Sequence, residues 1–149
     1  MVSIEVQSIA EVQGPQQDPV DEDWGSVESS IVLATDWYGV LHGIEQFSHA
    51  LVVVWMHQAP EPSGPHRRPR GRAELPELGI LAQRSRHRPN PIGVTVVEIV
   101  EVHRDRLVVR GLDAVDGTPV LDLKPYVPAF DVREATVPTW MDRLMEGYF

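Results

Sequence analysis

Two stretches of the chain combine charged and polar side chains with features that could bind an anion or a small ligand. The first spans residues 83–93 and contains three arginines, a serine and a histidine, with prolines on both sides of Asn90. Because proline restricts the backbone, the chain is stiff here, and stiffness suits a preorganised contact with a ligand. The simpler alternative is a rigid turn whose arginines are solvated.

The second stretch spans residues 111–126 and places three aspartates and one lysine within a short distance along the chain. These side chains could form the acidic wall of a pocket. Alternatively, Asp113 and Asp116 accept hydrogen bonds from turn amides, as aspartate commonly does. That alternative explains Asp122 and Lys124 less well, because an alternating strand would place both on one face.

Several common sites are excluded by the residue types present. The chain has no cysteine, so disulfides and thiol nucleophiles are impossible. It has neither a dinucleotide-binding glycine motif nor a phosphate-binding loop, and no nucleophile elbow. The six histidines lack close metal-ligand spacing, so we predict no metal site.

Basic charge is concentrated in one window of an acidic protein. The formal net charge is −9, from 13 basic and 22 acidic residues. Residues 1–66 contain no lysine or arginine, whereas residues 67–88 contain seven arginines and two glutamates. Overall acidity argues against a nucleic-acid partner. The arginine window instead favours a local surface that faces an anion, although a solvated loop would have the same composition.

The elements that must position these residues are mostly strands, because apolar residues recur with a period of two. Strands are predicted over residues 2–12, 28–34, 50–56, 79–83, 94–103, 106–110 and 120–123. A helical turn is expected at 38–41 and a helix at 139–146, between Pro138 and Gly147. Residues 59–78 contain five prolines and two glycines, which predicts a long loop. Short strands with few helices indicate a small antiparallel barrel or sandwich.

The length and hydropathy of the chain favour one soluble domain over residues 1–149. A chain of 149 residues is the usual size of a single domain. Its longest apolar run, Ala50–Met56, is much shorter than the roughly 20 residues of a membrane span. The first residues alternate and carry no basic cluster, unlike a signal peptide. We therefore expect a cytoplasmic protein without a membrane partner.

Both stretches resemble motifs of one known family. Residues 84–93 read Arg-Ser-x-His-Arg-Pro-Asn-Pro-Ile-Gly, and residues 111–126 read Gly-Leu-Asp-x-x-Asp-Gly-Thr-Pro-Val-Leu-Asp-x-Lys-Pro-Tyr. Together with Phe47–Ala50 and His57-Gln58, they resemble the TsaA-like (TrmO) family of tRNA threonylcarbamoyladenosine N-methyltransferases. The resemblance implies a mainly β, single-domain antiparallel β-barrel with short helical segments and no Rossmann fold. It also implies a homodimer that binds S-adenosyl-L-methionine.

The resemblance also implies which residues bind that cofactor. They are His57, Gln58, Arg84, Val94, Asp113, Ala114, Val115 and Asp116, with Asp23 and Trp24 from an N-terminal loop near residues 21–25. Carboxylates would stabilise the sulfonium cation, and Arg84 would pair with the methionyl carboxylate. Val94 and Val115 would cover the adenine, and Trp24 could stack on a ring.

We assign the acceptor side to Asp122, Lys124 and Tyr126, which would orient or deprotonate the methyl acceptor. Methyl transfer is an in-line displacement, so alignment is the main requirement. The alternative is that these three residues form a structural polar strand end. The sequence does not identify the base.

The leading acceptor is the threonylcarbamoyl-modified adenosine beside the anticodon of tRNA, with the arginines of residues 67–88 facing the anticodon stem. The chain departs from the family at Gln83, where threonine is usual, and at Arg86, where proline or threonine is common. Its loop at residues 18–25 is acidic and would repel phosphate. A small-metabolite acceptor therefore remains an alternative, as does a barrel that binds S-adenosylmethionine without catalysis.

Overall fold

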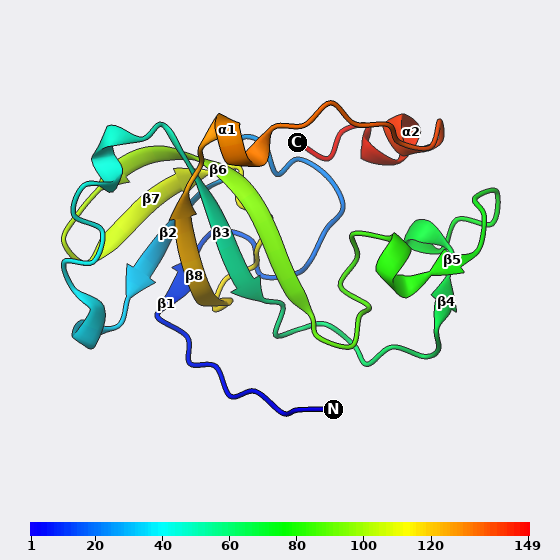
Figure 1. The fold of residues 1–149 in the computed structure, drawn as a ribbon, viewed down its shortest axis with the longest axis horizontal. Helices are drawn as coiled ribbons and strands as arrows, with labels where there is room; N and C mark the ends of the chain where they lie inside the picture. Colours follow the sequence, from blue (N-terminus) through cyan, green and yellow to red (C-terminus); the bar gives the residue numbers. More distant parts are fainter.

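Six strands with alternating burial close into an antiparallel barrel. The computed structural model describes residues 1–149, and the strand order around the barrel is β1-β2-β7-β6-β3-β8 (Figure 1). The strands are β1 Ala10–Gln13, β2 Glu28–Leu33, β3 His49–Trp55, β6 Ile92–Val102, β7 Arg106–Arg110 and β8 Pro119–Pro125. Every neighbouring pair is antiparallel. The prediction of a non-Rossmann β-barrel is confirmed.

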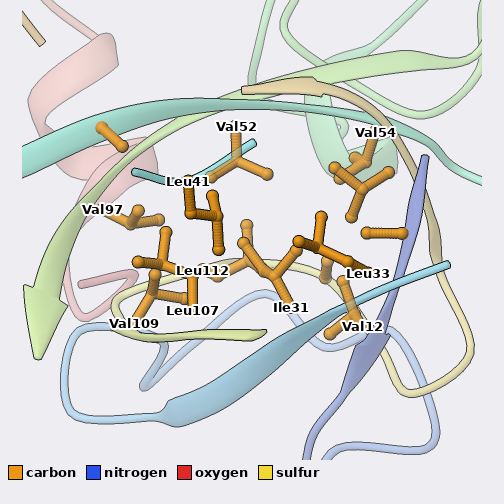
Figure 2. Packing of buried hydrophobic residues seen from close by; sticks show 14 of the residues in the cluster. Val12, Ile31, Leu33, Leu41, Val52, Val54, Val97, Leu107, Val109 and Leu112 are labelled. Atoms are coloured by element: carbon orange, nitrogen blue, oxygen red, sulfur yellow. The ribbon is translucent and has the colours of Figure 1, made fainter. Parts of the chain in front are cut away.

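The barrel interior is filled by the apolar residues that the period-two pattern points inward (Figure 2). Val12, Ile31, Val52 and Leu107 come from four different strands, and each is almost completely inaccessible to solvent. On β3 and β7 the buried positions alternate with partly exposed ones. Burial of this apolar surface is the main contribution that stabilises a closed sheet.

The prediction of a strand over residues 2–12 is wrong for its first part. The strand begins only at Ala10, and Val2, Ile4 and Val6 are all more than half exposed. Strand β2 ends at Leu33. The next residue, Ala34, donates its backbone N–H to the Ile9 carbonyl, and the chain then turns into a 3₁₀ helix, Thr35–Trp37. An alternating segment without a neighbouring strand has no apolar face to bury.

Residues 59–91 leave the barrel and return to it, forming a separate excursion beside the barrel (Figure 1). The excursion contains a two-stranded sheet of β4 His66–Arg67 and β5 Leu78–Gly79, and a 3₁₀ turn at Pro69–Gly71. The predicted strand over 79–83 is wrong. It is replaced by a 3₁₀ turn, Ile80–Ala82, because the buried Gln83 amide binds the carbonyls of Arg67 and Leu78.

Helices are few and short. Helix α2, Met141–Met145, is a shortened form of the helix predicted over 139–146, and Gly147 follows it with a φ of 72°. Helix α1, Pro128–Asp131, lies after β8 and has no counterpart in the sequence prediction. The helical turn expected at 38–41 is displaced to Thr35–Trp37 and Ile44–Gln46. None of the helices has the length and hydropathy needed to span a membrane.

Candidate functional site

The residues predicted to bind a cofactor gather at one end of the barrel. Strands β1, β3 and β7 end there, and β2, β6 and β8 begin there, as their antiparallel registers require. The chain between β7 and β8 covers this end with the buried residues Leu112, Ala114 and Val115. Segments that are remote in sequence therefore meet at one rim, which we call the covered end.

Asp113 lies within the covered end and has two hydroxyl partners. Its Oδ1 accepts a hydrogen bond from the Thr95 hydroxyl on β6. Its Oδ2 accepts one from the Tyr148 hydroxyl at 2.6 Å. A carboxylate oxygen has two lone pairs, so each oxygen keeps the capacity to accept a further donor.

Asp116 joins its turn to the distant N-terminal segment around Gly14. Its Oδ1 accepts a hydrogen bond from the backbone N–H of Gly14 at 3.0 Å, and its own N–H donates to the Gln16 carbonyl at 2.7 Å. The turn that contains Asp116 requires Gly117, whose φ is 74°. This turn holds residues 14–17 against the covered end.

His57 and Gln58 lie in an exposed turn directly after β3. The Gln58 side-chain amide donates to the Gln17 carbonyl at 3.3 Å. Residues 14–17 thus contact both the 113–116 turn and Gln58. Sequence reasoning assigned the N-terminal contribution to residues 21–25 and missed Gln16 and Gln17. Gly14-Pro15 predicts a loop here, but the local sequence does not indicate which residues this loop contacts.

Arg84 and Val94 are in direct contact although ten positions separate them. The Arg84 guanidinium donates from Nη2 to the Val94 carbonyl at 2.7 Å. Arg84 is exposed, and Val94 keeps 42% of its surface accessible on the outer face of β6. The remaining guanidinium N–H groups can therefore bind a carboxylate next to an exposed apolar side chain.

Asp23 and Trp24 lie in a loop that is hydrogen-bonded to Gly147 and Tyr148. Their backbone N–H groups donate to the carbonyls of Gly147 and Tyr148, both at 2.9 Å. Trp24 is 2% exposed, and its indole N–H donates to the Val20 carbonyl. The indole ring is thus part of the packed interior, and stacking on a ligand would require it to move.

The three residues predicted for the acceptor side are strung along the outer face of β8. Asp122 and Lys124 form an ion pair of 2.6 Å. Tyr126 directly follows the last residue of β8 and lies about 13 Å from Asp122, where its ring contacts His49. The structure brings the first two together and leaves Tyr126 towards the opposite end of the barrel.

Asp122 is the one of these three that approaches the cofactor residues. It is paired with Val53, which is paired on its other side with Val94. Residues paired across a sheet share a face, and two strand spacings amount to about 10 Å. Asp122 and Val94 therefore lie on the same outer surface on either side of Val53.

Most arginines of the 67–88 window are bound within the protein. Arg68 and Arg88 donate to backbone carbonyls of the excursion, and Arg72 pairs with Glu74. Arg67 donates to the ring of His87. Arg86 has no such partner. Burial, followed by the charges of Arg67 and Arg86, lowers the pKa of His87, so its neutral form is favoured here.

Other features of the surface do not overlap with these residues. One hollow is lined by α2 residues such as Arg143 and Met145. Another lies between Leu41 and Val102. The structure contains no group of three histidine, aspartate or glutamate side chains placed to hold a metal ion. The covered end is therefore the part of the molecule that combines the predicted ligand-binding side chains.

Comparisons with known proteins identify the family of the chain. Residues 10–132 match the family model of the tRNA-methyltransferase O N-terminal domain. An S-adenosyl-L-methionine-binding protein of Archaeoglobus fulgidus is 46% identical over 103 residues, which are 69% of this chain and 72% of that protein. The tRNA (adenine(37)-N6)-methyltransferase of Escherichia coli is 34% identical over 140 residues, which are 86% of this chain and 60% of that protein.

A solved structure is also similar. The crystal structure of TrmO from Pseudomonas aeruginosa superposes with a TM-score of 0.77 at 30% sequence identity. The match covers 95% of this chain and 63% of that one. This chain thus spans less than two thirds of the length of both the Escherichia coli protein and the solved structure.

Proposed function

The chain belongs to the family of the tRNA-methyltransferase O N-terminal domain, and on this premise we propose that it transfers a methyl group from S-adenosylmethionine to an adenosine of tRNA. The acceptor is N6 of the threonylcarbamoyl-modified adenosine beside the anticodon. Two relatives, from Escherichia coli and Mus musculus, carry the name tRNA (adenine(37)-N6)-methyltransferase. Position 37 is the position beside the anticodon.

The meeting of unlike ligand-binding groups at the covered end carries the proposal. Arg84 offers unused N–H groups beside exposed Val94. Asp113 has free lone pairs, and Gln58 has an amide oxygen that accepts no hydrogen bond from the protein. A carboxylate, a cation, ribose hydroxyls and an adenine are the parts of S-adenosylmethionine, and this set of groups fits them.

Each residue of the proposed cofactor site then has a distinct role. Arg84 binds the carboxylate of the amino-acid part, and Val94 covers the apolar face of the adenine. Asp113 accepts hydrogen bonds or faces the positive charge. Val115, which the sequence predicted to cover the adenine, is only 6% exposed and, with buried Ala114, holds the Asp113 backbone in place. Asp116, His57 and Gln58 shape the rim around residues 14–17. Asp23 and Trp24 anchor the neighbouring loop. When bound, the cofactor supplies an electrophilic methyl group on a sulfonium sulfur.

The acceptor nitrogen is placed by the outer face of β8. As its bond to the methyl carbon forms, the carbon–sulfur bond breaks, and the proton of the nitrogen must leave. Asp122 is the nearest of the three acceptor residues to Val94 on that surface, and it takes this proton. Lys124 orients the Asp122 carboxylate through their ion pair, and Tyr126 contacts the substrate further along the strand.

We further propose that residues 1–149 act as one domain in a cytoplasmic homodimer. Trp55, Ile92 and Val96 are each more than one third exposed, and the pairs Trp55–Ile92 and Leu51–Val96 place them on the outer face of β3 and β6. An exposed apolar patch of this kind is typical of an interface, and the occupant is a second copy of the chain. Val96→Asp should convert the dimer to a monomer in light scattering, whereas Val2→Asp should not.

The decisive experiment measures the product. The protein is incubated with S-adenosylmethionine carrying a labelled methyl group and with tRNA that contains the modified adenosine. Mass spectrometry of the nucleosides should show one labelled methyl group on that adenosine. Asp122→Asn should lower kcat while leaving the calorimetric affinity for S-adenosylmethionine within about twofold. Unchanged turnover in both Asp122→Asn and Tyr126→Phe would remove the proposed acceptor site.

One observation supports a second candidate function. A relative with 46% identity is named S-adenosyl-L-methionine-binding protein, and one with 38% identity is named a probable protein of that kind; neither name includes a reaction. A barrel that binds the cofactor without catalysis would take up S-adenosylmethionine in calorimetry but label neither tRNA nor a metabolite extract. Label in the extract alone would identify a small-molecule acceptor.

A further inference from the structure

Residues 147–149 dock onto the covered end of the barrel. Two backbone hydrogen bonds join them to the 18–25 loop, from Asp23 to Gly147 and from Trp24 to Tyr148. Gly25 allows the approach, because a Cβ there would lie 2.6 Å from the carbonyl carbon of Phe149. This segment lies beyond the residues that match the family model, which end at 132.

Tyr148 is held on several sides. Its hydroxyl donates to Asp113 Oδ2 at 2.6 Å, and the Arg70 guanidinium lies over its ring, 5.4 Å from the ring centre. The Phe149 ring packs edge-on against the Tyr148 ring, with 4.8 Å between the two ring centres. Arg70 is also 3.9 Å from Asp21. The phenol therefore has one well-defined position, and that position points its hydroxyl at Asp113.

Asp113 receives one hydroxyl on each oxygen, Thr95 on Oδ1 and Tyr148 on Oδ2. Two donors from different elements restrict rotation of the carboxylate. Each oxygen keeps a lone pair for a further donor, so the contacts orient the carboxylate without consuming it. A binding group that is already oriented loses less conformational entropy when the ligand arrives.

We infer that Tyr148 is a positioning residue, whose hydroxyl fixes the Asp113 carboxylate in the orientation that binds S-adenosylmethionine. This inference rests on the proposed function, in which Asp113 contacts the cofactor. Burial and the adjacent Asp113 charge raise the pKa of Tyr148. The hydroxyl is therefore protonated, and able to donate, throughout the neutral range.

The test is calorimetric titration of the whole protein with S-adenosylmethionine. Tyr148→Phe removes only the hydroxyl and should weaken binding about tenfold, because the freed carboxylate must then lose its rotational freedom when the ligand binds. Tyr38→Phe is the matched control, because Tyr38 is an exposed tyrosine outside the covered end. It should leave the affinity within about twofold. Equal affinities of wild type and Tyr148→Phe would overturn the inference while leaving the proposed function intact.

A double-mutant cycle separates positioning from general stabilisation. In an Asp113→Asn background, adding Tyr148→Phe should change the affinity less than about twofold, because the carboxylate that it positions is gone. A further tenfold loss there would show that Tyr148 acts through the fold and would overturn the inference.

If Asp113→Asn does not fold, Thr95→Val replaces it as a second route to the same carboxylate. Thr95→Val should weaken binding several-fold, and no effect would contradict the inference. Absence of binding by the wild type would overturn the proposed function, and this inference with it.

Discussion

The barrel and the 59–91 excursion are stabilised in different ways. In the barrel, 15 buried apolar residues, most of them on the strands, form one cluster. In the excursion, two-residue strands are supplemented by side chains that bind backbone carbonyls, those of Arg68, Gln83 and Arg88. Arginines that the sequence predicted to bind an anion therefore stabilise the fold of the excursion instead.

The same difference separates the two proposed binding surfaces. The cofactor residues lie on a rim whose position is determined by the barrel core. The arginines that the sequence predicts to face tRNA lie on the excursion, where most of them are already bound within the protein. Arg86 is the arginine of this window whose side chain has no protein partner among the hydrogen bonds and ion pairs of the structure.

Leu107→Ala should produce the largest loss of stability. Leu107 is 0% exposed in the barrel core, and removing a fully buried leucine side chain costs about 2–5 kcal/mol. Leu81→Ala is the matched control in the excursion, where the side chain is 71% exposed, and should change stability by less than about 0.5 kcal/mol. Urea denaturation measures both. Similar losses for the two leucines would contradict the division between core and excursion.

Gln83→Ala should destabilise the excursion more than the barrel. The variant leaves the carbonyls of Arg67 and Leu78 without their donor, a loss of about 1–3 kcal/mol. Amide hydrogen exchange should therefore rise in residues 66–88 and stay unchanged in β3 and β6. Gln7→Ala, on an exposed residue, serves as the control. Equal exchange throughout the chain would mean that the two regions unfold as one unit.

Acidification should loosen the excursion slightly. The pKa of His87 is lowered from 6.5 by burial and by Arg67 and Arg86. The unfolded chain therefore binds a proton first as the pH falls. The contribution of His87 to stability is present above pH 6.5 and is lost as the pH falls through its lower folded pKa. An NMR titration of its ring protons should show a midpoint below 6.5. A midpoint at or above that value would refute the stated environment.

Arg86→Ala should have the smallest effect on stability, below about 0.5 kcal/mol, because the guanidinium makes no bond within the protein. It should still weaken tRNA binding and reduce the salt slope by about one. Arg68→Ala should do the reverse, lowering the thermal midpoint while leaving the salt slope nearly unchanged. If both variants changed only stability, the excursion would not face the RNA.

Local patterns predicted the strands in which buried and exposed residues alternate along the chain. The β6–β7 hairpin and β3 were recognised within two residues of their ends. The same period-two pattern was misleading over residues 2–9, because alternation makes a strand possible but does not provide the partner that completes it. The prediction of a strand over residues 79–83 was wrong for a related reason. The burial of Gln83 depends on a hydrogen bond to Arg67, which is 16 positions away.

The candidate site likewise contains residues that the sequence predicted and residues that it did not. The 83–93 and 111–126 stretches were recognised because their residue types and turn prolines or glycines are adjacent in sequence. Gln16 and Gln17 were missed because their carbonyls become part of the rim only through Asp116 and Gln58. Tyr148 was missed because it reaches Asp113 across 35 positions.

What the sequence determined alone is the chemistry available and the class of fold: no thiol, a period of two, and two stiff polar segments. Backbone stereochemistry and side-chain type impose these properties locally, wherever the residues later lie. Only the folded chain decided which arginines keep a free guanidinium and which hydroxyls meet Asp113. Those outcomes depend on how the barrel closes. Closure brings together residues that are far apart along the chain, and the local sequence does not indicate that they will be neighbours.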